Sequence, residues 1–245
     1  MKNMVAAASS VLVATSLCYA DKSPEAMTNA LTSMRIWAGY GSYAMGDFND
    51  KLASENNQQI DGGMNLGIDI SVFTIDLKLP STVPGVNGSN KIRIPLGVEY
   101  LEASSQSTHG GATVEWNLPV VGLYCAPEIV FAKRAWLYIR PLGLGYYTLG
   151  SLLNADLSVS DRPGAIDVSG GALGISTQVG VKYPIEQCDL FAQLGYRRLV
   201  FADVDQDPHG GFTESVGGRP VQAGKLKEDL DYSGLSLVTG ICWNF

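Results

Sequence analysis

The stretch 201–217 carries the side chains with the most evident chemical potential. It contains Asp203, Asp205, Asp207 and His209, followed by two glycines. Alternating carboxylates could coordinate Ca²⁺, which prefers oxygen ligands, although the bidentate glutamate of an EF-hand is not at the required spacing. Asp207 and His209 could instead act as a base and its orienting group in a hydrolase. A solvated acidic loop is the simpler interpretation.

His109 is the second candidate for chemistry. Ser104, Ser105 and Ser107 precede it closely, which would suit the Ser/His pair of a lipid hydrolase. No acid that would orient the imidazole can be identified. The sequence also lacks a Gly-rich phosphate loop, a Cys-x-x-Cys pair and a His cluster, so we expect no cofactor, assign no metal site and do not expect an enzyme.

Composition narrows the class of protein. The 245 residues are 46% hydrophobic but only 17% charged, below the roughly 25% that is usual for soluble domains. Such a chain is too apolar to be disordered. The net charge of −7 argues against a nucleic-acid partner, which would require a basic face.

The first twenty residues have the pattern of a secretory signal peptide. Lys2 precedes a small-residue apolar stretch, and Cys18-Tyr19-Ala20 offers a cleavage site before Asp21. The apolar stretch is too short to span a bilayer of about 30 Å. We therefore expect 1–20 to be removed on export and 21–33 to form an N-terminal periplasmic segment.

The rest of the chain is dominated by alternation of apolar and polar residues. A period of two over about ten residues predicts strands with one apolar face, long enough to cross a bilayer when tilted. The predicted strands are 34–44, 63–75, 91–102, 112–125, 135–149, 170–183, 188–200 and 231–245. Eight strands suit a closed antiparallel transmembrane β-barrel over 34–245, and ten are possible if 151–169 folds into another hairpin.

Connections and aromatic residues agree with this interpretation. Short turns at 132–134 and 184–187 lie on one side, and long polar loops at 151–169 and 201–230 lie on the other, whereas the connection 76–90 is longer than its side predicts. Two aromatic girdles are expected. The lower girdle would contain Tyr124, Trp136, Tyr183, Trp243 and Phe245, and the upper one Tyr43, Tyr100, Trp116, Tyr146 and Tyr196.

The terminal strand carries a family resemblance. Residues 235–245 end on an aromatic residue and place Leu237, Ile241, Trp243 and Phe245 on one face. In this respect the chain resembles the small eight-stranded outer-membrane barrels of the OmpA, OmpX and OmpW type. The resemblance implies that these four residues form the signal read by the barrel-assembly machinery. It also implies a location in the cell outer membrane, but it indicates little about activity.

Charged residues in the strands would then face the lumen. They are Asp69, Arg93, Glu99, Glu115, Arg140, Lys182 and Arg197. Buried charges require partners, and three acids against four bases nearly balance. The network either fills a lumen too narrow for a wide pore, which we favour, or lines an ion path. A soluble lipocalin-like barrel would instead have a polar outer face.

The cysteines leave two possibilities open. Cys18 departs with the signal peptide, so Cys125, Cys188 and Cys242 remain, and an odd number leaves at least one thiol unpaired. Cys188 and Cys242 lie on neighbouring predicted strands and could form a disulfide. Three free thiols are the alternative.

The predicted function is a monomeric outer-membrane barrel with a structural or surface role, such as envelope integrity or loop-mediated adhesion. Its expected partners are outer-membrane lipid and, during biogenesis, the barrel-assembly machinery. A narrow small-solute channel of the OmpW type is one alternative. An outer-membrane hydrolase, either a protease or a lipid A deacylase, is another. The sequence does not indicate a ligand, substrate or host partner.

Overall fold

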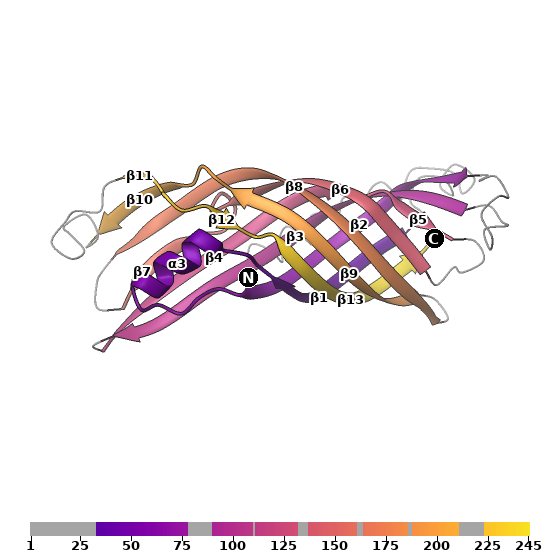
Figure 1. Cartoon of the computed structure of the whole chain (residues 1–245). Coiled ribbons are helices and arrows are strands. Elements are labelled where there is room, and N and C mark those ends of the chain that lie inside the picture. The colour runs from indigo at the N-terminus through magenta and orange to yellow at the C-terminus, as the bar shows by residue number, and fades with distance from the viewer. Residues whose placement is uncertain are drawn as a thin grey trace.

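The computed structural model describes residues 33–77, 90–109, 111–131, 137–160, 164–185, 188–210 and 223–245. These residues form antiparallel strands and one helix (Figure 1). The elements are β1 (Ser33–Ser42), α3 (Gly46–Ser54), β2 (Gly62–Leu77), β3 (Asn90–His109), β4 (Ala112–Cys125), β5 (Glu128–Val130), β6 (Leu137–Leu149), β7 (Asp156–Val159), β8 (Gly164–Ile185), β9 (Cys188–Phe201), β10 (Asp205–Gly210), β11 (Gly224–Lys225), β12 (Leu230–Asp231) and β13 (Gly234–Asn244). In this part of the chain, no helix has the length and apolarity needed to cross a membrane.

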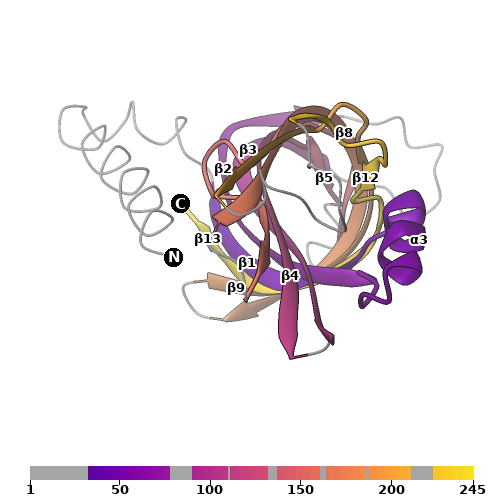
Figure 2. The ribbon, with the colours of Figure 1, turned by 90° about the vertical axis from the view of Figure 1, so that its left-hand side faces the viewer.

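The long strands follow one another around a closed ring. Antiparallel pairing leads from β1 through β2, β3, β4, β6, β8 and β9 to β13, which pairs again with β1. Figure 2 shows this ring from the end that carries α3. We call this the upper end, and the end where β1 begins and the chain stops the lower end. Closure leaves the long strands without a free edge over most of their length.

Two short strands enlarge the ring. The course of β4 is interrupted at Ala126-Pro127, because proline has no N–H for the ladder, and β5 then continues between β3 and β6. Near the upper end, β7 lies between β4 and β8, beyond the end of β6. Counted with β5 and β7 the ring has ten members within a sheet of thirteen strands. The predicted closed all-β sheet is therefore observed, whereas the predicted count of eight is not confirmed.

The stretch 151–169, for which the sequence left a further hairpin open, does pair β7 with the beginning of β8. Other elements were not predicted. Helix α3 and the strands β10 and β11 arise from stretches interpreted as loops. The predicted signal peptide and most of the predicted N-terminal segment lie outside the described residues.

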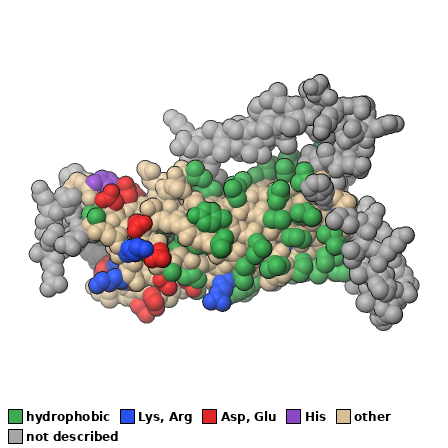
Figure 3. All heavy atoms as spheres, turned by 90° about the horizontal axis from the view of Figure 1, so that it is seen from above, with side chains coloured by type: hydrophobic (Ala, Val, Ile, Leu, Met, Phe, Trp, Pro, Cys, Tyr) green, Lys and Arg blue, Asp and Glu red, His purple; other side chains and the backbone are tan. Residues whose placement is uncertain are grey.

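Side chains alternate between the two faces of the sheet. In β9, Leu190, Leu194 and Tyr196 are exposed, whereas Phe191 and Arg197 are buried in the lumen. Figure 3 shows hydrophobic side chains over the body of the molecule, while acidic and basic side chains gather toward the upper end, at the left. The apolar face therefore points outward and the polar face inward.

Glycines make room for large rings in the lumen. Trp37, Tyr124, Tyr138 and Tyr147 are buried. Each ring lies over a glycine directly opposite it on a neighbouring strand, namely Gly67, Gly97, Gly180 and Gly122 respectively. A Cβ atom at any of these glycines would overlap the ring. The narrow lumen is thus filled by pairing its largest side chains with its smallest residues.

A cluster of buried apolar side chains lies near the upper end, where α3 packs against residues of the inner face of the sheet. Phe48 of α3 packs edge-on against Trp116, with ring centroids 5.1 Å apart. Leu52 and Ile60 are buried in the same cluster, and the Tyr232 hydroxyl donates a 2.6 Å hydrogen bond to the carbonyl of Leu118. We call this cluster of buried residues the upper plug.

The plug corrects part of the predicted aromatic girdles. Tyr43 and Trp116 belong to the upper plug, and Tyr124 is buried in the lumen. These three rings were expected on the outer face. Tyr146, Tyr183, Tyr196 and Phe245 are exposed. The side chain of Trp136 lies outside the described residues.

The fit between ring and glycine can be tested at Gly122. Replacing Gly122 by Ala should lower the free energy of unfolding by about 1–3 kcal/mol, because the added methyl group overlaps the Tyr147 ring. Urea unfolding in detergent micelles measures the change. Gly224→Ala is the control, since nothing lies within 4 Å of its Cβ position. Equal stability of the two variants would contradict this account of the lumen.

Candidate functional site

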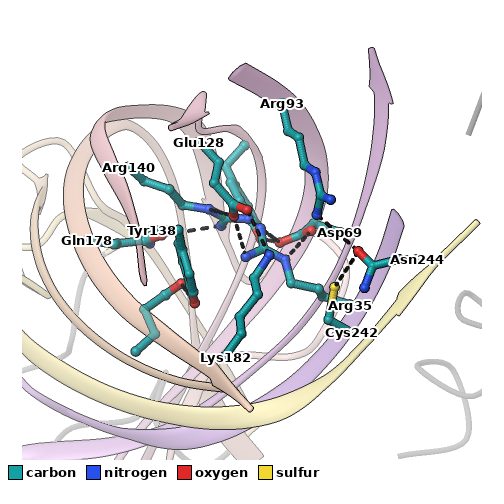
Figure 4. A network of polar contacts seen from close by, with 12 residues as sticks. Arg35, Asp69, Arg93, Glu128, Tyr138, Arg140, Gln178, Lys182, Cys242 and Asn244 are labelled. Carbon is teal, nitrogen blue, oxygen red and sulfur yellow. Dashed lines mark hydrogen bonds and ion pairs between the residues drawn. The ribbon is translucent and has the colours of Figure 1, made fainter. Parts of the chain in front are cut away.

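A cluster of five charged side chains occupies the lower part of the lumen. Arg35 of β1, Asp69 of β2, Glu128 of β5, Arg140 of β6 and Lys182 of β8 are each no more than 6% exposed. Figure 4 shows them converging from different sides of the ring. We call them the lower charge cluster. Arg35 and Asp69 are direct neighbours across β1 and β2, whereas Glu128, Arg140 and Lys182 come from strands further around the ring.

Arg35 is at the centre of the cluster. Its Nε and Nη2 donate to the two carboxylate oxygens of Asp69 at 2.9 and 3.0 Å, in the bidentate geometry that suits a guanidinium. Its Nη1 donates to Glu128 Oε2 at 2.7 Å. One guanidinium therefore connects both carboxylates of the cluster.

Arg140 and Lys182 complete the network. Arg140 donates to Asp69 at 3.0 Å, to Glu128 at 3.3 Å and to the Gln178 side chain at 3.3 Å. Lys182 Nζ donates to Glu128 Oε1 at 2.9 Å. Glu128 thus receives three cations. Three positive charges face two negative ones, which leaves the cluster with one excess positive charge.

Aromatic rings surround the cluster. The guanidinium of Arg35 lies 5.6 Å from the ring centroids of both Tyr138 and Phe191, and Lys182 Nζ lies 4.8 Å from that of Tyr138. The Tyr124 hydroxyl donates to Asp69 at 2.8 Å. Rings exclude water while their faces attract cations, so these contacts partly offset the loss of hydration.

A second ion pair lies between the lower charge cluster and the upper plug. Arg197 donates to Glu99 at 2.8 Å, and the Tyr147 hydroxyl donates to the other oxygen of Glu99, also at 2.8 Å. The Tyr43 hydroxyl donates to Asn65 at 2.9 Å. Within the described residues, Arg197 Nε and Asn65 Nδ2 are buried without a hydrogen-bond partner. The side chains that fill the lumen therefore form three successive groups: the lower charge cluster, the Glu99–Arg197 pair and the upper plug.

The predicted luminal residues lie in different parts of the structure. Asp69, Arg140 and Lys182 lie in the lower charge cluster, and Glu99 pairs with Arg197 above it. Arg93 is half-buried and donates to Asn244 at 3.1 Å, outside the cluster.

The inward placement of Glu115 was wrong. The neighbouring Trp116 takes the inward position to meet Phe48, so Glu115 is exposed on the other face.

Two members of the cluster were missed in the sequence. Arg35 lies between Met34 and Ile36, so alternation alone would have placed it in the lumen. Glu128 follows the interruption at Pro127, where the alternation of β4 is lost. No sequence pattern indicated that Glu128 faces the same direction as Asp69.

The predicted assembly signal lies on β13 and at the end of the chain. Leu237, Ile241 and Phe245 are exposed, and Trp243 is half-buried. Leu237 and Ile241 share the outward face of the strand with Leu235. Recognition of these residues by an assembly machinery stays a prediction.

The other chemical candidates are dispersed at the upper end. His209 Nδ1 lies 3.7 Å from the Asp167 carboxylate, and both side chains are exposed. Lys225 donates to Asp203 at 2.6 Å, and this hydrogen bond lowers the pKa of Asp203. In the described part of the chain no group of His, Cys, Asp or Glu side chains is arranged to hold a metal ion. The side chain of His109 lies outside the part of the chain that the structure describes.

The described cysteines carry free thiols. Cys125 and Cys188 are half-buried and Cys242 is buried. Asp189, and not Cys188, lies opposite Cys242 in the pairing of β9 with β13. The disulfide left open by the sequence is therefore absent from the structure.

Comparison with known proteins gives no family assignment. No family model matches the chain, and no curated protein matches it significantly. Among solved structures, the crystal structure of a major outer membrane protein from Thermus thermophilus aligns with a TM-score of 0.41 and 12% identity, over 87% of this chain and 99% of that chain. A score at this level does not establish a shared fold, so function has to be argued from this chain's own residues.

Glu128 provides the test of the lower charge cluster. Glu128→Gln should lower the free energy of unfolding by about 3–5 kcal/mol, because three buried cations would share one remaining carboxylate. The measurement is the urea midpoint of the refolded protein. Glu228→Gln is the matched control: its 3.3 Å pair with Lys51 is partly exposed and should contribute no more than about 1 kcal/mol. Similar losses in both variants would indicate that water reaches the lower cluster.

Proposed function

We propose that this protein is a β-barrel of the outer membrane with a structural and surface role. The observation that carries the proposal is the reversed placement of polar and apolar side chains. Arg35, Asp69 and Glu128 are 1% exposed inside the ring, whereas Leu173 is 80% and Leu123 66% exposed outside it. Large exposed apolar patches are rare on soluble monomers and mark contact with lipid or protein.

The height of the apolar surface supports a position in lipid. On β8 the outward residues from Leu173 to Tyr183 carry no charge, and Asp167 is exposed nearer the upper end. At about 3.3 Å per residue and a tilt of about 40°, that span covers roughly 25 Å, the height of the apolar band in outer-membrane barrels. Tyr183 at one end and Tyr146 and Tyr196 nearer the other suit membrane interfaces.

The filled lumen favours a structural role over transport. The lower charge cluster, the Glu99–Arg197 pair and the upper plug follow one another along the ring axis. In each of these three regions the side chains are paired or closely packed, which would hinder the passage of hydrated solutes through the lumen. The charged upper end, which includes β10, β11 and α3, would remain outside the lipid. It is therefore the surface that would bind other molecules.

The proposal also covers the type of barrel, the export of the chain and its assembly in the membrane. In this proposal the eight long strands form the barrel proper and β5 and β7 are additions to it, which would make the chain similar to the small outer-membrane barrels that the sequence resembles. In this reading the chain is exported with a signal peptide and is monomeric. Its assembly machinery recognises Leu237, Ile241, Trp243 and Phe245, and it needs neither cofactor nor catalytic activity.

Lysine substitutions test the position in lipid. Leu194→Lys should destabilise the protein refolded in phospholipid vesicles by about 2–4 kcal/mol, because the charge would enter the apolar layer. Leu152→Lys, in the connection between β6 and β7, is the control. Both leucines are exposed, at 50% and 66%, so a water-soluble barrel would tolerate both changes. Flotation with vesicles and a heat-dependent shift on a denaturing gel report insertion, and equal tolerance of both substitutions would contradict the proposal.

Conductance distinguishes the structural role from the channel alternative. Because Phe48, Leu52 and Trp116 close the upper end of the lumen, planar bilayers containing the protein should show no steady ionic current. A reproducible current would favour a channel. Its dependence on Phe48→Ala would then locate the constriction in the upper plug.

A further inference from the structure

A continuous row of outward-facing residues climbs around the ring. Each member lies directly opposite the next on the neighbouring strand. The row consists of Met34, Ile70, Leu96, Cys125, Leu144, Ile175 and Arg198. It starts near the lower end on β1 and finishes near the upper end on β9. Six uncharged residues therefore lead to one guanidinium.

An apolar groove follows the middle of this row. A second row runs parallel to it through Val98, Leu123, Tyr146 and Leu173. Gly97, Gly145 and Gly174 lie between the rows on β3, β6 and β8, so backbone contributes to the floor of the groove. The groove has a volume of about 710 Å³. Its walls are almost entirely aliphatic and aromatic.

Arg198 stands at the upper end of the row in a polar recess. The recess has a volume of about 490 Å³, and Ser42, Tyr196, Asp231 and Ser233 contribute to its lining. Arg198 forms no ion pair with any residue that the structure describes. Asp231, the acid in the recess, accepts a 2.8 Å hydrogen bond from the backbone N–H of Ser233. The guanidinium is thus available to an external anion.

The dimensions match a single acyl chain. From Leu96 to Arg198 the row crosses four strand intervals of about 4.8 Å, or roughly 19 Å along an inclined path. Half of a bilayer's hydrocarbon core is about 15 Å thick. A chain that starts at Arg198 and follows the inclined groove would therefore end near the middle of the bilayer.

We propose that this path binds one anionic, phosphate-bearing membrane lipid. Its phosphate pairs with the guanidinium of Arg198 in the polar recess, and one acyl chain lies in the groove across β3, β4, β6 and β8. The site rests on the proposed membrane position. It is specific because the other outward positions on β9, from Leu190 to Tyr196, carry no cation that could hold a head group.

Native mass spectrometry of the full-length protein can test the site. Phosphatidylglycerol and phosphatidylcholine are added in parallel to the detergent-solubilised barrel. The barrel should retain one phosphatidylglycerol about tenfold more strongly than phosphatidylcholine, because the choline ammonium of phosphatidylcholine offsets the charge of its phosphate beside Arg198. Arg198→Gln should remove this preference, whereas Lys225→Gln, an exposed lysine outside the row, should preserve it. An unchanged preference in Arg198→Gln would overturn the assignment.

A second pair of variants tests the groove. Leu144→Trp fills it and should reduce phosphatidylglycerol retention, whereas Leu194→Trp, on β9 outside the groove and similarly exposed at 50% against 56%, should not. Equal retention in both would indicate annular lipid only, and a dimer mass in place of bound lipid would indicate a second copy on this face. Both outcomes overturn the proposal. Failure of the membrane position itself is distinguishable, because the wild-type protein would then not float with vesicles.

Discussion

The narrow, closed ring is the constraint on which the rest of the structure depends. Once β13 pairs with β1, every inward side chain must share a space that excludes bulk water. Arg35, Asp69 and Glu128 could not remain charged there alone, because desolvation of an isolated ion costs far more than any single contact returns. Their hydrogen bonds solve this problem. Arg35 and Asp69 lie directly opposite each other on the neighbouring strands β1 and β2, whereas the bond from Arg35 to Glu128 joins strands that are not neighbours and needs the curved ring.

The same constraint explains the division of the lumen into levels. Charged groups gather where Tyr138 and Phe191 can face them, whereas the buried cluster near the upper end consists of the apolar side chains of α3 and its neighbours. Glycines opposite the largest rings adjust the packing strand by strand. A buried ionic network of this kind favours a single register, because a shift by one residue would turn Arg35 or Asp69 onto the apolar outer face.

Much of this organisation could be predicted from the alternation of residue types, and the exceptions have physical causes. The long strands are local patterns, so β2, β4 and β9 were identified to within two residues of their ends, whereas β8 begins six residues earlier than predicted. Glu115 was misplaced because its neighbour Trp116 turns inward to meet Phe48. Glu128 was missed because Pro127 interrupts the alternation. Helix α3 is short, and its buried face depends on a distant strand. Interactions that join distant segments do not appear as a period in the sequence.

Alternation also makes the two faces of the sheet chemically independent. Tyr124 bonds Asp69 in the lumen, whereas its neighbours Leu123 and Cys125 line the outer groove. Side chains of alternate residues lie on opposite faces of the sheet, so a substitution of an outward side chain in the groove removes no side-chain contact of the lower charge cluster. The free-energy changes caused by substitutions at such separated sites usually add. In the proposed membrane position, residues of the outer face could therefore change without loss of the paired charges inside the ring.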